Sequence, residues 1–116
     1  MYYIYIIMCE NNILYTGIAK DIEKRLHEHY FKLKSSAKFT KSHQMLELKT
    51  LYLAENRSDA SKLEYLIKKL TKKQKLLLIN DEKYFNELFS TYIDTSKYTF
   101  ITKENQLEIF SKIKEK

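Results

Sequence analysis

The sequence predicts a single α/β (α+β) domain that begins with a β-hairpin and continues with helices and further strands. Three observations lead to this fold class. Two runs rich in β-branched and aromatic side chains meet at the asparagine pair Asn11–Asn12. Apolar side chains then recur at helical spacing behind capping residues. The length of 116 residues suits one modest core and is too short for two.

The N-terminal half is expected to contain a hairpin, a helix, a loop and a third strand. The hairpin strands are predicted over Tyr2–Cys9 and Ile13–Ala19. Asp21 is a good N-cap for a helix to about residue 33, with an apolar stripe formed by Ile22, Leu26, Tyr30 and Leu33. Residues 34–44 are polar and basic, which favours a loop, and residues 45–54 are typical of a strand.

The C-terminal half is expected to hold two more helices and an extension. Ser58 or Asp59 is the predicted cap of the second helix, whose inner face comprises Leu63, Leu66, Ile67 and Leu70. Thr71 and Gln74 form a capping box that opens a short third helix. Residues 81–116 are slightly acidic, with a strand candidate at 98–101 and a helix from about residue 104. Because no proline- or glycine-rich linker intervenes, we expect residues 81–116 to pack as a C-terminal α/β extension or cap on a domain formed by residues 1–80.

Positive charge is concentrated in the middle of the chain. The net charge is +6 and the isoelectric point is about 9.2, yet residues 31–80 carry 12 basic and 4 acidic side chains, and the rest is slightly acidic. A local basic surface suits a phosphate-bearing partner. The alternative is the lysine-rich usage of an AT-rich genome, in which the lysines only form solvated faces.

Composition excludes several other classes of protein. The single cysteine, Cys9, rules out an internal disulfide and a four-cysteine zinc site, and His27, His29 and His43 do not combine with it at zinc-finger spacing. The apolar N-terminus lacks a basic segment and soon reaches Glu10, so no signal peptide is expected. No apolar run approaches the ~20 residues that cross a bilayer. We expect a cytoplasmic protein without a membrane partner.

Gly17 is the only glycine in the chain. Where glycine is so rare, a retained glycine suggests a position that tolerates no Cβ atom, because φ is positive or because another group approaches the backbone. The alternative is a simple bulge near the end of the second strand. Its neighbours, Tyr15 and the basic helix that follows, favour a functional reason.

Three polar side chains on the predicted helices are candidates for a phosphate-processing site. Arg25 and His29 are four residues apart and share one face of the first helix, where a guanidinium and an imidazole suit a phosphate. Glu64 lies at the border of the inner face of the second helix, where a carboxylate reaches a cleft without being buried unpaired. Each residue also has a structural alternative. Arg25 would be a surface residue whose aliphatic stem packs on apolar side chains, and His29 would be a half-buried packing residue. Glu64 would close a capping box that begins at Ser61.

Together these residues resemble the GIY-YIG nuclease superfamily, most closely its small single-domain bacterial members. The pattern comprises Tyr3-Ile4-Tyr5, Tyr15-Thr16-Gly17, Arg25 and His29 in EKRLHEH, and Glu64 in SKLEYLIKKLT, in order within residues 1–80. The combination is specific, although each part alone is weak. Two departures are evident. Tyr3 replaces the glycine of the first motif, and only Asn80 is a candidate for the polar residue that relatives place after the metal glutamate.

The resemblance implies a three-stranded antiparallel sheet between helices, in the order β-β-α-β-α-α, and metal-dependent hydrolysis of nucleic-acid phosphodiesters, with DNA processing or repair as the expected role. It implies that Gly17 is the motif glycine, that Glu64 is the metal ligand, and that the catalytic residues are Tyr5, Tyr15, Arg25, His29 and Glu64. Arg25 would bind phosphate and His29 would transfer a proton. Two other functions stay open: a non-catalytic nucleic-acid-binding module on the same fold, and a structural partner-binding protein.

The chemistry of phosphodiester hydrolysis is consistent with these roles. It requires an activated water, charge neutralisation and help for the leaving oxygen. One carboxylate is enough to hold a single hydrated Mg²⁺ or Mn²⁺ ion, and the sequence shows no further acidic residues at the spacing of a two-metal cluster. Tyrosine, with an ordinary pKa of about 10, is a poor base unless cations lower that pKa, for which Arg25, the metal and Lys20 are candidates. Gly17 would then let substrate or a helix approach the strand beside Tyr15.

Further basic side chains are expected to contact the substrate. Besides Gly17, those assigned to substrate binding are Lys20, Lys38, Lys41, Lys69 and Lys72, and Lys32, Lys34, Lys68, Lys73 and Lys75 enlarge the basic surface. If these lysines contact phosphates, binding weakens steeply with salt.

The hairpin register decides whether the two motif tyrosines share a site. A two-residue turn at Asn11–Asn12 would place Tyr5 and Tyr15 on opposite faces, because side chains alternate with period two. We therefore expect an odd-length loop, with Cys9 opposite Tyr15 and Tyr5 opposite Ala19. The five catalytic candidates are then expected to line one shallow cleft.

Overall fold

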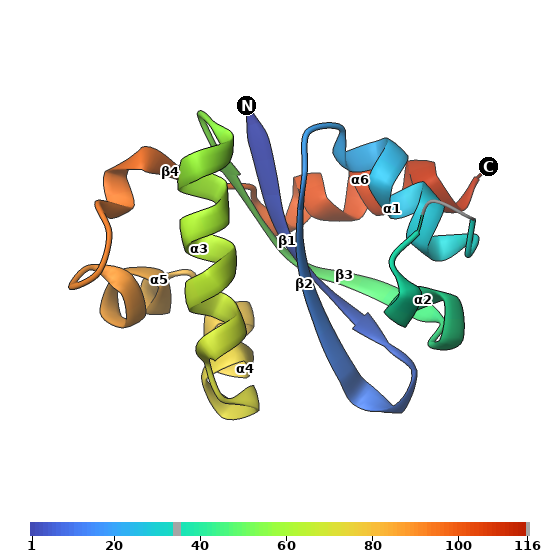
Figure 1. Cartoon of the computed structure of the whole chain (residues 1–116), viewed down its shortest axis with the longest axis horizontal. Coiled ribbons are helices and arrows are strands. Elements are labelled where there is room, and N and C mark those ends of the chain that lie inside the picture. Colours follow the sequence, from blue (N-terminus) through green and yellow to red (C-terminus); the bar gives the residue numbers. More distant parts are fainter. Residues whose placement is uncertain (34–35, 116) are drawn as a thin grey trace.

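The computed structural model describes residues 1–33 and 36–115 and shows a sheet with helices on both faces (Figure 1). The strands are β1 (Tyr2–Cys9), β2 (Ile13–Ala19), β3 (Met45–Ala54) and β4 (Tyr98–Phe100). The helices are α1 (Ile22–Tyr30), α2 (Lys38–Ser42), α3 (Arg57–Lys69), α4 (Lys72–Asn80), α5 (Lys83–Phe89) and α6 (Lys103–Lys114). Two short 3-10 helices, η1 (Glu10–Asn12) and η2 (Thr95–Lys97), complete the described elements. Within these ranges, the helices are too short or too polar to span a membrane.

The sheet is antiparallel and has four strands in the order β2-β1-β3-β4. The prediction of three strands is therefore wrong. The fourth strand comes from the C-terminal extension, where Phe100 pairs with Tyr52 and Tyr98 pairs with Ala54 of β3. The order of elements also differs, because α2 lies between the first helix and the third strand.

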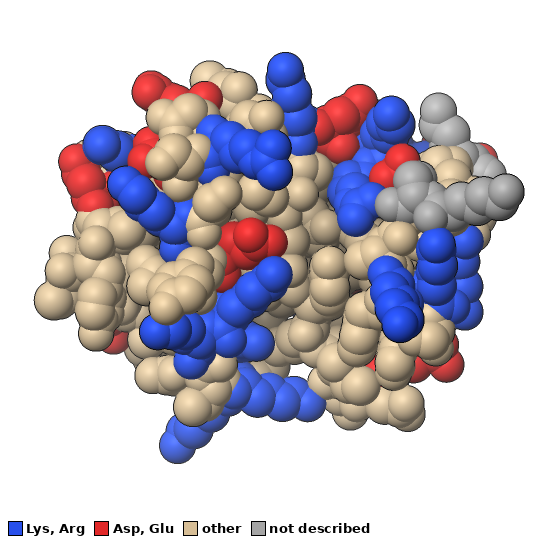
Figure 2. All heavy atoms as spheres, viewed as in Figure 1, with Lys and Arg blue, Asp and Glu red and all other residues tan. Residues whose placement is uncertain are grey.

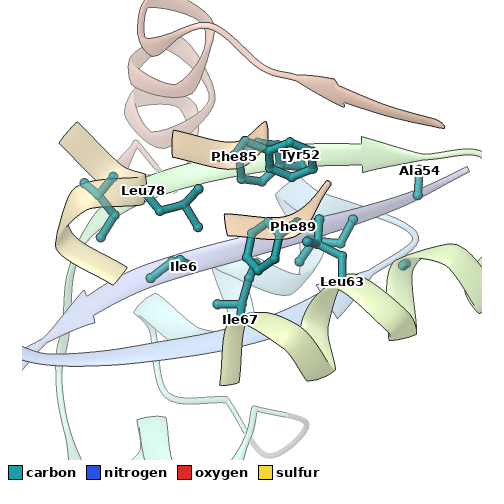
Figure 3. Close-up of a cluster of buried hydrophobic side chains, with 11 residues drawn as sticks. Ile6, Tyr52, Ala54, Leu63, Ile67, Leu78, Phe85 and Phe89 are labelled. Atoms are coloured by element: carbon teal, nitrogen blue, oxygen red, sulfur yellow. The ribbon is translucent and has the colours of Figure 1, made fainter. Parts of the chain in front are cut away.

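Side chains alternate across β1, and each face of the sheet packs on its own set of helices. On one face, Ile4 and Ile6 are buried among side chains of α3, α4 and α5 (Figure 3). On the other face, Tyr5 and Ile7 are buried among side chains of α1 and α6 that include Leu26 and Phe110. Burial of a large apolar side chain contributes about 1.5–3 kcal/mol. The central strand β1 therefore lies between two small cores, one on each face of the sheet, and the expectation of a single core is wrong.

Two of the three helix caps predicted from the sequence are present. Asp21 accepts the N–H of Lys24 at the start of α1, and the capping box of Thr71 and Gln74 is present on α4. α3 is capped by Asn56 and not by Ser58 or Asp59. Because Asn, Ser and Asp are equally good caps, this difference of two or three residues could not be predicted locally.

α1 ends at Tyr30 and not near residue 33, because Lys32 adopts a left-handed conformation with φ of 55°. The N–H of Leu33 donates to the carbonyl of Glu28 at 2.9 Å, and the N–H of Lys32 donates to the carbonyl of His29 at 3.3 Å. This pair of bonds is the Schellman motif, which usually carries a glycine where Lys32 stands. The expected loop over residues 34–44 contains α2, while residues 34–35, and with them Lys34, lie outside the described residues.

The hairpin loop has three residues, as the expectation of an odd length requires. Asn11 and Asn12 both have positive φ, 65° and 58°, which asparagine tolerates better than most residues. The register pairs Cys9 with Ile13, Ile7 with Tyr15, and Tyr5 with Gly17. The predicted pairs are wrong by two residues, but Tyr5 and Tyr15 share a face, because a shift of two preserves the alternation.

Candidate active site

Tyr5 lies across the backbone of Gly17. A Cβ atom on Gly17 would be 2.6 Å from Cζ and 3.2 Å from Cε1 of the Tyr5 ring. The φ of Gly17 is not positive, and the pairing of β1 with β2 is regular at this residue, so neither an unusual backbone conformation nor a bulge explains the glycine. The close approach expected at Gly17 is made by the Tyr5 ring. A direct contact of Gly17 with substrate stays a prediction.

A chain of hydrogen bonds runs from Tyr5 through α1 into α2. The Tyr5 hydroxyl is 2.7 Å from Nε2 of His29, and Nδ1 of His29 is 2.8 Å from Oγ1 of Thr40. The Thr40 hydroxyl in turn donates to the carbonyl of Ala37 at 3.0 Å. Tyr5, His29 and Thr40 are all buried. We name these three residues the buried chain.

Burial governs the protonation of the buried chain. Burial, and then the neighbouring Tyr15, raise the pKa of Tyr5 above its ordinary value, and the charge and hydrogen bond of Arg25 oppose this only in part. Burial, and then the charge of Arg25, lower the pKa of His29 to about 4. Both rings are therefore neutral at pH 7. Arg25 lowers the pKa of Tyr5, as expected of a neighbouring cation, but burial outweighs this effect and the net shift is upward.

Arg25 connects the buried chain with the surface. Its side chain is 28% exposed, and its guanidinium pairs with the carboxylate of Glu28 at 3.0 Å. Its charge and a hydrogen bond also act on the Tyr5 hydroxyl. This contact with a buried group distinguishes Arg25 from a surface arginine that only covers apolar side chains.

Tyr15 packs its ring between His29 and α2. The rings of Tyr15 and His29 meet edge-on with centroids 5.6 Å apart, and Tyr15 stacks on Phe39 at 5.6 Å. Phe39 stacks in turn on His43 at 4.2 Å. Because Tyr15 is only partly buried, its ring lies between the buried chain and the solvent.

Glu64 lies on α3, whose buried side chains belong to the opposite face of the sheet. Its side chain is 22% exposed, and its carboxylate pairs with Lys68 at 3.3 Å, an i,i+4 contact of a kind that contributes about 0–1 kcal/mol. Its charge nevertheless acts on the Tyr5 hydroxyl and contributes to the raised pKa. The Glu64 charge can act on a hydroxyl of the other face because β2 is the edge strand, so no further strand lies between the two faces there. Ser61 lies inside α3, so the capping box considered for Glu64 is not formed.

The five catalytic candidates therefore form two layers. Tyr5 and His29 are 1% and 0% exposed, so they do not line a surface cleft, and the expectation that all five residues line one shallow cleft is wrong for these two. Tyr15, Arg25 and Glu64 are partly buried and form the accessible layer. The catalytic roles of all five residues stay predictions.

A metal ion at this site would rely on few protein ligands. Within residues 1–33 and 36–115, no group of three or more His, Cys, Asp or Glu side chains is arranged to hold a metal ion. A single carboxylate suits Mg²⁺, which keeps most of its water ligands. The Glu64 carboxylate fits this requirement, because it is partly exposed and its lysine partner is itself 54% exposed.

Three of the lysines expected to bind substrate lie on the N-terminal elements. Lys20 is exposed directly after β2, and Lys38 and Lys41 are exposed on α2, on either side of Thr40 in the sequence. Figure 2 shows basic side chains on both sides of this face of the molecule, over α3 and α4 and over α1 and α2, with a small group of acidic atoms near the middle.

The other two lysines make contacts of their own. The Nζ of Lys69 on α3 lies 4.7 Å from the ring centroid of Tyr65. The Nζ of Lys72 on α4 donates to the carbonyl of Asn12 in the hairpin loop at 2.6 Å. Asn80, the last residue of α4, is exposed and lines a depression together with residues of β3 and α6. Substrate contacts of these residues stay predictions.

Thr40, Phe39 and His43 are the site residues that the sequence does not indicate. All three lie in a segment whose polar composition predicts a loop. A threonine in such a segment gives no local sign of burial, since its partner His29 becomes a neighbour only when α2 packs on α1. A buried polar side chain of this kind is recognised only from tertiary contacts.

Comparisons with known proteins agree on one family. A family model described as the GIY-YIG catalytic domain matches residues 1–77. A UPF0213 protein of Fusobacterium nucleatum is 43% identical over 79 residues, which cover 68% of this chain and 77% of the relative. A UPF0213 protein of Staphylococcus saprophyticus is 41% identical over 80 residues, covering 69% and 95% of the two chains.

A UPF0213 protein of Clostridium perfringens is 36% identical over 94 residues, covering 81% of this chain and 99% of the relative. No solved structure matches the chain. The matched family region contains β1, β2, α1 and α3, and with them the tyrosines, the arginine and the glutamate of the site. The chain therefore belongs to the GIY-YIG catalytic domain family.

Proposed function

We propose that this protein is a nuclease that hydrolyses phosphodiester bonds of nucleic acid, with DNA as the expected substrate and one Mg²⁺ or Mn²⁺ ion as cofactor. The observation that carries the proposal is the convergence of a guanidinium, a phenol and a carboxylate from three elements. The Tyr5 hydroxyl of β1 feels the charge of both Arg25 on α1 and Glu64 on α3, although these two helices pack on opposite faces of the sheet. Membership of a family described as a catalytic domain supports it.

Arg25 is the group that binds the scissile phosphate in this proposal. A guanidinium pairs with two phosphate oxygens, and one such preorganised donor contributes about 2–4 kcal/mol to a transition state that gains negative charge. Glu64 would hold the metal ion, which neutralises phosphoryl oxygens and makes a bound water more acidic.

The two motif tyrosines take different roles. Tyr5 is buried and its pKa is raised, so it stays protonated and supports Arg25 from behind. Tyr15 is partly exposed on the same face of the hairpin and is the tyrosine that reaches substrate or its attacking water. His29 acts through Tyr5, because its own ring is buried.

The basic side chains extend the site along the phosphate backbone. Lys38 and Lys41 are carried by the helix that also carries Thr40, and Lys69 lies five residues beyond Glu64 on α3. We assign to them, and to Lys20 and Lys72, the contacts with phosphates that flank the scissile bond.

Cleavage assays on duplex, branched and single-stranded DNA and on RNA, with Mg²⁺, Mn²⁺ or EDTA, test the proposal. We expect cleavage that requires a divalent ion and is abolished in Glu64→Gln, while binding to the same substrate persists. Glu108→Gln is the matched control, because Glu108 forms an i,i+4 pair with Lys112 on α6, as Glu64 does with Lys68 on α3.

Two outcomes would contradict the proposal. Binding without cleavage under every condition would favour a nucleic-acid-binding module. Cleavage by Glu64→Gln at the wild-type rate would reject Glu64 as the metal ligand, and an equal loss in Glu108→Gln would indicate a general effect of charge.

A further inference from the structure

The buried chain has a direction, and the carbonyl of Ala37 sets it. A carbonyl oxygen only accepts, so the 3.0 Å contact with Thr40 uses the single hydroxyl hydrogen of the threonine. The Thr40 oxygen then faces Nδ1 of His29, 2.8 Å away, as an acceptor. Nδ1 must therefore carry the hydrogen in this contact.

The same tautomer of His29 satisfies the other end of the chain. With Nδ1 protonated, Nε2 has a free lone pair and accepts the hydroxyl hydrogen of Tyr5 at 2.7 Å. The lone pairs of the Tyr5 oxygen are then available to Arg25, whose guanidinium only donates. With this tautomer, every successive contact from Arg25 through Tyr5, His29 and Thr40 to Ala37 has one donor hydrogen and one acceptor.

The opposite tautomer fails at both ends. If Thr40 donated to Nδ1, its oxygen would face the Ala37 carbonyl oxygen at 3.0 Å with no hydrogen between them. Nε2–H would donate to the Tyr5 oxygen, and the hydroxyl hydrogen of Tyr5 would turn toward the donors of Arg25. The three side chains are buried, so solvent does not replace a lost partner, and an unpaired buried group costs about 1–3 kcal/mol.

We propose that Thr40 is a positioning residue that holds His29 in the Nδ1–H tautomer and thereby turns the Tyr5 oxygen toward Arg25. The hydrogen bond at one imidazole nitrogen determines what the other nitrogen does, and here that bond comes from α2. The effect on catalysis rests on the proposed function, whereas the tautomer does not.

Nitrogen-15 NMR of the imidazole rings tests the tautomer directly in the full-length protein at pH 7.5. Spectra of His27→Gln and His43→Gln identify the His29 signals by elimination. We expect a protonated Nδ1 and an unprotonated Nε2 in the wild type, and a shift toward Nε2–H in Thr40→Val, with Thr40→Ser restoring the wild-type pattern. A wild-type spectrum with Nε2 protonated, or a Thr40→Val spectrum with an unchanged tautomer, would overturn the proposal.

Cleavage kinetics test the consequence. A misplaced partner behind a catalytic group typically costs about 10- to 100-fold, so we expect kcat of Thr40→Val to fall by that factor while KM changes little and Thr40→Ser recovers activity. Thr50→Val is the matched control, because Thr50 is equally buried and pairs with Ile6, whose side chain lies on the other face. Equal losses in Thr50→Val and Thr40→Val would overturn the positioning role. Absence of cleavage in the wild type would refute the proposed function and leave the NMR result to decide the tautomer.

Discussion

Replacing Gly17 with alanine should destabilise the fold through the Tyr5 ring. The new Cβ would lie 2.6 Å from Cζ of Tyr5, which is 0.8 Å short of the 3.4 Å at which ordinary contact begins. Tyr5 is 1% exposed, so its ring has no open space to enter. Overpacking of this kind costs about 1–3 kcal/mol, and alanine recovers about 0.4–1 kcal/mol because the backbone conformation permits it. We expect the free energy of unfolding to fall by about 1–2 kcal/mol and Tm to fall by roughly 5–10 °C.

Urea unfolding in three backgrounds tests this origin of the loss. Tyr5→Phe keeps Cζ, so Gly17→Ala should remain costly, whereas Tyr5→Leu removes the ring and should make Gly17→Ala neutral or stabilising. The difference between backgrounds is the coupling energy of a double-mutant cycle. A cost of Gly17→Ala that is the same with leucine as with tyrosine at position 5 would refute the steric explanation. Gly17→Ala should also slow cleavage under conditions in which the variant is still folded. The displaced Tyr5 ring would lose its hydrogen bond with His29.

Acid, a conservative arginine substitution and salt each test another part of the site. The pKa of His29 is lowered to about 4, so below pH ~6.5 the unfolded chain binds a proton that the folded protein does not, and the free energy of unfolding should fall by about 3 kcal/mol between pH 7.5 and pH 4. Urea unfolding across this range measures the fall, which His29→Gln should remove; equal pH dependence in both proteins would contradict it. Arg25→Lys keeps the charge but loses the two-pronged contact, so single-turnover cleavage should slow by about 10- to 100-fold, and an unchanged rate would mean that Arg25 does not touch the phosphate. The logarithm of the DNA association constant should fall with the logarithm of salt concentration, with a slope of about −0.9 per phosphate contact. Replacing any one of four lysines with glutamine should make this slope about 1 less steep; the four are Lys38, Lys41, Lys69 and Lys72. A slope near zero in the wild type would show that these lysines are only solvated.

The sequence by itself determined the features that depend on neighbours along the chain. The bounds of β1, β2 and β3, the caps at Asp21 and Thr71, and the family follow from local propensity, periodicity and motif spacing. The shared face of Tyr5 and Tyr15 was predictable too, because it depends only on whether the loop has an odd or an even number of residues.

Only the tertiary structure decided the features that depend on contacts between distant segments. The register of the hairpin, the place of β4 in the sheet and the burial of Tyr5 and His29 each require elements to pack before they are defined. Thr40 is the clearest case, since its hydroxyl becomes part of the site only when α2 packs on α1 and encloses it with His29. Burial also reversed the expected direction of the Tyr5 pKa, because removing a phenol from water outweighs the charge of one neighbouring arginine.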